Sequence, residues 1–304
     1  MTRVFRGLYA GSEYWAGLGP KARVLHLARS LSDAHPNWVF CGPTAAVVHG
    51  LEISYAYLNR IHASCPNVGR SSSESLVWHW LPHERPTRVG GIPVTSVART
   101  AFDCMRYLPF SRGLAIADSY LRMSGSGRGD LREALELWGG SDNLNQAKVT
   151  LSFADGRSEN GGESCARAAM IELGYQIPEL QVEVPNEIEG GMFRVDFLWD
   201  LPGGRSVAGE LDGWGKYLAE DVEKSEGATS ASEHAIQTMT AERLRESRLS
   251  RRLEVMRFSY QQARDLDYML RLLEGFGVPR ASCMRNVDVR RRLPRWVSQS
   301  GRMT

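Results

Sequence analysis

Two strand-like segments carry acidic residues in a pattern that could bind a metal ion. In residues 193–199 and 206–212, hydrophobic residues alternate with polar ones, as in half-buried β-strands, and the Pro-Gly-Gly between the segments predicts a tight turn. A hairpin centred on Gly203 places Asp196 opposite Glu210. Two negative charges at that spacing, roughly 4.5–5.5 Å between Cβ atoms, repel each other, so the pair needs a cation or a raised pKa. Because Mg²⁺ prefers carboxylate oxygens, we predict that Asp196 and Glu210 bind Mg²⁺ or Mn²⁺.

The same alternation predicts which side chains share a face of each strand. In the first strand the hydrophobic side chains are expected on one face and the polar ones on the other: Phe193, Val195, Phe197 and Trp199 against Arg194 and Asp196. In the second strand the expected groups are Val207 with Leu211, and Glu210 with Asp212. The acidic residues are thus expected on the faces opposite the hydrophobic ones.

Three further residues, Glu163, Asp212 and Lys216, complete a set suited to phosphodiester hydrolysis. In that chemistry, oxygen ligands hold a metal that lowers the pKa of a water and neutralises charge on the phosphate. A nearby lysine orients the nucleophile or offsets the phosphate charge. Each residue alone also has a structural interpretation: Glu163 as an acid favoured by a helix dipole, and Asp212-Gly213 as a turn.

The elements around these residues predict an α/β sandwich in the second half of the chain. A helix over 163–173 is expected to end at Gly174 as its C-cap. Three strands, a charged helix, a strand and a final helix follow at about 179–184, 192–199, 206–212, 239–252, 253–258 and 261–274. The order αβββαβα is that of a small α/β sandwich.

The first half predicts a separate α+β domain, so that the whole chain falls in the α/β class. A strand pair is expected over 3–9, with β structure again at 38–41 and 60–95. Helices are expected at 20–31, from Pro43, and at 96–106, 111–123 and 129–138. Because residues 139–162 are rich in Gly, Asn, Ser and Asp, part of that stretch is the expected boundary. We therefore predict domains over 1–145 and 146–278, with an arginine-rich tail over 279–304.

Length and composition fit a two-domain protein of the cytoplasm. The chain has 304 residues, 42% of them hydrophobic and 24% charged, with a net charge of +2 that is too small to name a partner. The five cysteines are odd in number and lack a Cys-x-x-Cys pair, which argues against a disulfide framework or a zinc knuckle: Cys41, Cys65, Cys104, Cys165 and Cys283. The chain lacks an apolar run long enough to span a bilayer and a signal-peptide start.

The C-terminal motifs are Glu163, Arg-Val-Asp-Phe-Leu-Trp, Gly-Glu-Leu-Asp-Gly-Trp-Gly-Lys-Tyr, and Arg-Glu-Ser-Arg-Leu before Val-Met-Arg-Phe. Over about residues 160–275 they resemble the PD-(D/E)XK restriction-endonuclease-like superfamily, in the branch similar to very-short-patch repair endonucleases. The resemblance implies that Asp196 and Glu210 ligate Mg²⁺ and that Glu163 assists. It also implies that residues of the following helix line or brace the site: Arg245, Glu246 and Arg248.

One position departs from that superfamily. Its lysine two residues after the strand glutamate is Asp212 here, so Lys216 would have to supply the positive charge from a later position. Asp212 and Lys216 stay in the candidate catalytic set with Glu163, Asp196 and Glu210. The candidate nucleic-acid contacts are Arg194, Arg245 and Arg248. The departure bears on catalytic competence and leaves the expected fold unchanged.

The N-terminal motifs are Arg-Val-Phe-Arg-Gly-Leu-Tyr, Gly-Pro-Thr-Ala-Ala-Val-Val-His-Gly-Leu and Gly-Ile-Pro-Val-Thr-Ser-Val-Ala-Arg-Thr-Ala-Phe-Asp. Over about residues 3–123 they resemble abortive-infection type IV antitoxin (AbiEi-like) proteins and transcriptional regulators. The resemblance implies that residues 3–19 are the remnant of a winged helix-turn-helix domain. The helices that precede the wing in that family are missing here, so that either the DNA-reading helix is absent or the start codon is misassigned.

Other candidate sites have simpler interpretations. His79 and His83 are separated by Pro82, which would break a helix that aligned them as metal ligands, so we expect surface histidines. His49 is expected to be a packed or capping histidine. The arginines of the tail could contact phosphates, although a terminal charge run is more often solvated.

Two main functions remain open from the sequence. The first is a Mg²⁺-dependent DNA endonuclease whose N-terminal domain recruits DNA or a protein partner. The second is a non-enzymatic DNA-binding regulator or antitoxin-like protein, with a toxin partner, that keeps the nuclease fold as a scaffold. A tRNA- or nucleotide-binding adaptor is a third idea that rests only on the arginines.

Overall fold

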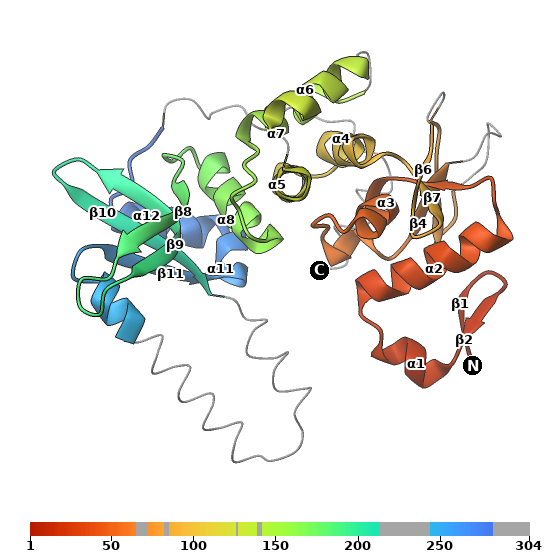
Figure 1. The fold of residues 1–304 in the computed structure, drawn as a ribbon, viewed down its shortest axis with the longest axis horizontal. Helices are drawn as coiled ribbons and strands as arrows, with labels where there is room; N and C mark the ends of the chain where they lie inside the picture. Colours follow the sequence, from red (N-terminus) through yellow and green to blue (C-terminus); the bar gives the residue numbers. More distant parts are fainter. Residues whose placement is uncertain (65–71, 82–84, 126, 139–141, 213–243, 282–304) are drawn as a thin grey trace. The chain divides into compact units, whose positions relative to one another are not determined.

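The protein has an α/β fold in two compact units. The computed structural model describes residues 1–64, 72–81, 85–125, 127–138, 142–212 and 244–281. One unit covers Met1–Gly161, and the second begins at Gly162 (Figure 1). Each unit contains its own sheet and its own covering helices.

The first unit combines a small hairpin, a five-stranded sheet and a group of helices. Its strands are β1 (Thr2–Phe5), β2 (Leu8–Ala10), β3 (Val39–Phe40), β4 (Ile61–Ser64), β5 (Leu76–His79), β6 (Thr87–Val89) and β7 (Ile92–Val94). Its α-helices are α1 (Ser12–Gly17), α2 (Pro20–Ala34), α3 (Gly42–His49), α4 (Val97–Tyr107), α5 (Phe110–Ser124), α6 (Arg128–Leu137) and α7 (Leu144–Phe153), with a 3-10 turn η1 (Tyr55–Tyr57). The sheet order is β5-β4-β3-β7-β6, and β1 pairs with β2.

Most elements of this unit agree with the sequence-based expectations, including the hairpin near the start and the helices begun by prolines. The difference is α7 (Leu144–Phe153), which lies inside the stretch that we expected to contain the domain boundary. This helix packs on α4 and α5 and buries Leu151, so it belongs to the first unit. Packing has overridden a weak local helix signal here.

One histidine of this unit, His79, is more buried than expected. His79 lies in β5, and its Nε2 is 3.0 Å from Nδ1 of the buried His62. Burial lowers the pKa of His79 to about 4. The expectation of a surface histidine is therefore wrong for His79, and His83 lies outside the described residues. His49 is packed as expected, with Nε2 2.8 Å from the Thr95 carbonyl oxygen.

The second unit is a four-stranded mixed sheet with helices. Its labelled elements are α8 (Gly161–Glu172), β8 (Glu179–Pro185), β9 (Met192–Leu201), β10 (Arg205–Asp212), β11 (Glu254–Ser259), α11 (Tyr260–Arg264) and α12 (Leu266–Gly275). Residues 244–249 form a further helical segment, the described part of the expected charged helix. The sheet order is β11-β10-β9-β8, and β10 runs parallel to β11. The expected final helix is divided at Asp265, whose side chain caps α12.

The hairpin between β9 and β10 has the predicted register. Phe197 faces Gly209 and Leu201 faces Arg205, and Asp196 and Glu210 are the residues that follow the last of these pairs on the two strands. Gly203 and Gly204 both have positive φ, a conformation that glycine adopts without strain. The two glycines of the turn therefore help to set which residues of β9 and β10 lie opposite each other.

The hydrophobic faces differ from expectation at one point in β9. Phe197, Trp199 and Leu201 pack in a large core cluster with α8 and α12. Phe193 and Val195 instead pack in a second cluster with Leu249 and Leu253. The change falls at Asp196, where the ladder with β8 is interrupted opposite Gln181, so the alternation of the first strand does not persist along its whole length.

In the part of the chain that the structure describes, no helix is both long and apolar enough to cross a membrane. Cys41, Cys104 and Cys165 are buried thiols.

Close packing in the hairpin yields a test of the fold. A Cβ at Gly209 would lie 3.0 Å from Cζ3 of Trp199 and 3.2 Å from Cβ of Phe197. We expect Gly209→Ala to lower the free energy of unfolding by about 1–3 kcal/mol because the strand must shift to relieve the overlap. Thermal unfolding followed by circular dichroism measures this change.

Gly275→Ala is the matched control. Its added Cβ would meet no atom within 4 Å among the described residues, so a change within about 0.5 kcal/mol is expected. Equal stability of the two variants would contradict the packing described for β9 and β10.

Candidate functional site

Glu163 lies in the first turn of α8, where the helix dipole favours an acidic group. Its carboxylate is buried, since the residue is only 4% exposed. The Oε2 atom accepts a hydrogen bond of 3.1 Å from Nε2 of Gln181 on β8. The helix thus delivers a buried carboxylate to the edge of the sheet, as the sequence predicts.

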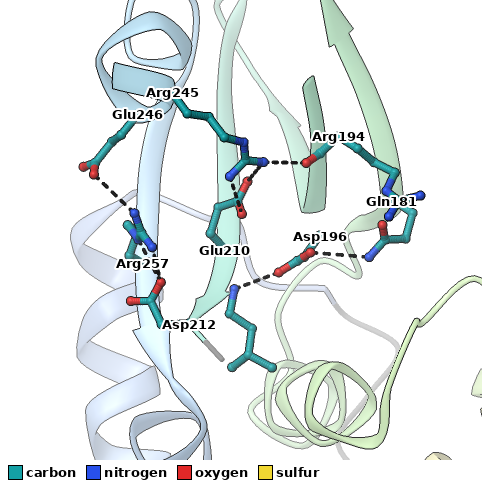
Figure 2. Close-up of polar contacts among 9 residues, drawn as sticks. Gln181, Arg194, Asp196, Glu210, Asp212, Arg245, Glu246 and Arg257 are labelled. Atoms are coloured by element: carbon teal, nitrogen blue, oxygen red, sulfur yellow. Dashed lines mark hydrogen bonds and ion pairs between the residues drawn. The ribbon is translucent and has the colours of Figure 1, made fainter. Parts of the chain in front are cut away.

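Asp196 is held from two sides. Its Oδ2 accepts a 2.9 Å hydrogen bond from the backbone N–H of Leu211 on β10, and its Oδ1 accepts a longer one, 3.4 Å, from Nε2 of Gln181 (Figure 2). The same amide nitrogen therefore joins Glu163 to Asp196. Side chains from α8, β8 and β9 meet at this point.

Glu210 is close to Asp196 but is compensated by an arginine. Its two carboxylate oxygens accept hydrogen bonds of 3.0 and 3.2 Å from Arg245, which also donates to the carbonyl oxygen of Arg194 (Figure 2). Burial raises the pKa of Glu210 above its ordinary value, Arg245 opposes the rise, and the negative charge of Asp196 adds to it. This coupling supports the predicted proximity of Asp196 and Glu210.

Asp212 belongs to a different group of charges. Its Oδ1 accepts hydrogen bonds from Arg257 on β11, one of them 2.9 Å from Nε, and Arg257 also donates to Glu246 at 3.4 Å (Figure 2). Asp212 and Glu210 lie two residues apart on β10, yet each carboxylate has its own arginine. Arg257 stands opposite Glu210 in the β10–β11 ladder and also lowers the Glu210 pKa.

The remaining predicted site residues have different outcomes. Lys216 lies outside the described residues. Arg248 forms an ion pair with Glu189, and Arg194 contributes its backbone carbonyl to Arg245. Arg245 binds the site carboxylate itself. The expected nucleic-acid contacts are therefore engaged with protein groups in this structure.

The donor set suits Mg²⁺, because Asp196 and Glu210 present carboxylate oxygens from neighbouring strands. The guanidinium of Arg245 contacts both oxygens of Glu210, so a metal ion and Arg245 compete for one carboxylate. Among the described residues, no group of three or more His, Cys, Asp or Glu side chains is arranged to hold a metal ion.

Gln181 and Arg257 are the residues that sequence analysis missed. Gln181 carries no acid–base or metal-ligand signature, and its importance follows from a backbone conformation and from two hydrogen bonds. Arg257 stood within the Val-Met-Arg-Phe motif, but that motif does not indicate which acidic residue it would contact. The parallel register of β10 and β11 sets Arg257 opposite Glu210, and its side chain reaches Asp212 two residues further along β10.

The opposing influences on Glu210 predict two shifts of opposite sign. Removing the guanidinium with Arg245→Met should raise the Glu210 pKa further, because burial and Asp196 then act unopposed. Removing the neighbouring charge with Asp196→Asn should lower it. Titration of the glutamate side-chain carboxyl carbons by ¹³C NMR measures both.

The same raised pKa has a defined consequence for stability. Because the folded protein holds the Glu210 proton more tightly than the unfolded chain, ionising this group costs stability as pH rises through the raised value. Below the ordinary glutamate pKa that cost is absent.

The two variants also define a contrary outcome. Shifts of the Glu210 pKa in the same direction in Arg245→Met and Asp196→Asn would contradict the described arrangement.

Comparisons with known proteins give relatives without an assigned activity. Two uncharacterized proteins of Mycobacterium tuberculosis, one from strain CDC 1551 / Oshkosh and one from strain ATCC 25618 / H37Rv, are each 35% identical to this chain over 161 residues. The match covers 53% of this chain and 58% of each relative, so the chain matches little more than half the length of these relatives. No protein-family model matches the chain, and no solved structure does.

Proposed function

We propose that the second unit is a metal-dependent phosphodiester hydrolase that acts on DNA in the cytoplasm. The observation that carries this proposal is that Gln181 links the carboxylates of Glu163 and Asp196, and that Asp196 lies near enough to Glu210 to raise its pKa. Bringing two negative charges together costs free energy. Functional sites, including those that bind a cation, are places where proteins keep such an arrangement.

In this proposal Asp196 and Glu210 hold Mg²⁺ or Mn²⁺, which when bound supplies positive charge to the phosphate and lowers the pKa of water. Asp196 is already oriented by the Leu211 N–H. Arg245 leaves Glu210 and contacts a substrate phosphate, since a guanidinium binds carboxylate and phosphate by the same paired hydrogen bonds. Glu163 supports the site through Gln181. Lys216 supplies the positive charge that a lysine would provide at the position that Asp212 occupies here.

The observed element order supports this proposal. The helix, three strands, helical segment, fourth strand and final helices of the second unit follow the αβββαβα order expected from the sequence for a restriction-endonuclease-like domain. That resemblance remains the source of the proposed substrate, and function is argued from the site because one fold serves many functions.

The arginine pairs favour a second candidate function. Arg245 neutralises Glu210 and Arg257 neutralises Asp212, as expected if the nuclease fold serves as a scaffold for a non-enzymatic regulator. In that case the first unit recruits DNA or a toxin-like protein partner, in line with its antitoxin resemblance. Binding of DNA would then fall with rising salt, without cleavage.

A nicking assay on supercoiled plasmid tests the first candidate. With Mg²⁺ or Mn²⁺ the full chain should nick the plasmid, and Asp196→Asn should reduce the rate by roughly 100-fold or more because a metal ligand loses its charge. Chelation by EDTA should abolish nicking in the wild-type protein.

Asp200→Asn is the matched control, since Asp200 lies on the same strand, is exposed, and accepts a 2.7 Å hydrogen bond from Ser206 that an asparagine also accepts. Its nicking rate should equal that of the wild type. Absence of nicking with either metal, together with a salt-sensitive mobility shift, would favour the regulator. Activity retained in Asp196→Asn would exclude this site.

A further inference from the structure

We propose that Gln181 is a positioning residue that holds Glu163 and Asp196 in a geometry that binds the metal ion. The inference rests on the proposed function and adds to it a residue outside the predicted acidic set. It is carried by an unusual backbone conformation and by the pair of hydrogen bonds that this conformation makes.

The backbone of Gln181 is strained within a β-strand. Its φ is +53°, and among the described residues only Gln181 and Asn143 have positive φ without being glycine. Asparagine tolerates positive φ more readily than glutamine does, so this conformation is less expected at Gln181 than at Asn143. Such outliers persist where the surrounding structure requires them, and they concentrate at functional sites.

The strained residue lies beside an acidic residue of the site, Asp196. Leu180 faces Phe197 and Val182 faces Val195, so Gln181 stands opposite Asp196, and the described ladder lacks a pair at this position. The left-handed residue turns the β8 side chain toward the carboxylates in place of a regular ladder contact. Figure 2 shows Gln181 and Asp196 directed toward each other.

The side chain of Gln181 matches what two carboxylates require. An amide nitrogen has two N–H donors, and Nε2 contacts one oxygen of Glu163 and one oxygen of Asp196. The Leu211 N–H holds the other oxygen of Asp196, so the plane of this carboxylate is set from both ends.

An amide compensates charge differently from the arginines nearby. Arg245 and Arg257 bring a full positive charge to Glu210 and Asp212. Gln181 donates hydrogen bonds without adding a net charge, so it orients Glu163 and Asp196 without itself reducing their attraction to a cation. A lysine or arginine at position 181 would orient the acids equally well but would cancel that attraction.

Two variants separate the backbone from the side chain. Gln181→Gly removes the amide and also the strain, whereas Gln181→Ala removes the amide but keeps a Cβ at positive φ. We expect the glycine variant to melt at a temperature equal to or above that of the wild type, and above that of the alanine variant. We expect both variants to bind Mn²⁺ roughly tenfold more weakly than the wild type, a loss typical for a residue that orients a metal ligand.

Calorimetric titration with Mn²⁺ in the absence of DNA measures that affinity. In nicking assays at saturating Mn²⁺, both variants should lower kcat and leave KM for plasmid unchanged, because Gln181 contacts carboxylates and not phosphate. A purely structural role would lower the melting temperature of the glycine variant and leave its Mn²⁺ affinity intact.

The outcomes distinguish this proposal from the function on which it rests. Wild-type protein that binds Mn²⁺ and nicks DNA, with unchanged affinity in both variants, overturns the role of Gln181 alone. Wild-type protein that neither binds Mn²⁺ nor nicks overturns the proposed function and this inference together. Weaker binding in both variants, with a stable glycine variant, supports the inference.

Discussion

The candidate site depends on the antiparallel pairing of β9 with β10, which brings two negative charges together. The glycine turn sets a register that ends at the pair of Phe197 and Gly209, next to Asp196 and Glu210. A shift of one residue would turn both acids to the other face of the sheet. Burial and the negative charge of Asp196 both raise the Glu210 pKa, and Arg245 opposes that rise.

The site answers that repulsion in two ways. Arg245 neutralises Glu210 by paired hydrogen bonds, and these same hydrogen bonds are the ones that a phosphate or a metal ion would have to replace. Gln181 meets Asp196 and Glu163 with a neutral amide, at the expense of a strained backbone. A fully neutralised cluster would have served stability alone. The described site therefore combines one acid that is paired with an arginine and two acids that are joined by an amide.

Local patterns were sufficient for much of the second unit. Period-two alternation located β9 and β10, helical periodicity and a closing glycine located α8, and the Pro-Gly-Gly turn predicted the register. Local patterns were insufficient where packing decided. Residues of α7 carry weak helical periodicity, yet packing against α4 and α5 makes them a helix. His79 resembled a surface residue because Pro82 follows it, whereas the adjacent strand sets it against His62.

The amino-acid sequence determines the chemistry that is available here: which carboxylates exist, which strands carry them, and the register of the hairpin between those strands, because strand alternation and turn geometry are local properties. How those charges are compensated depends on the folded chain. Arg245 and Gln181 reach the acids from elements far away in the sequence, and no periodicity encodes such long-range contacts. Which acid each of them contacts depends on distance and burial. Both are fixed only when α8, the sheet and the 244–249 segment pack together.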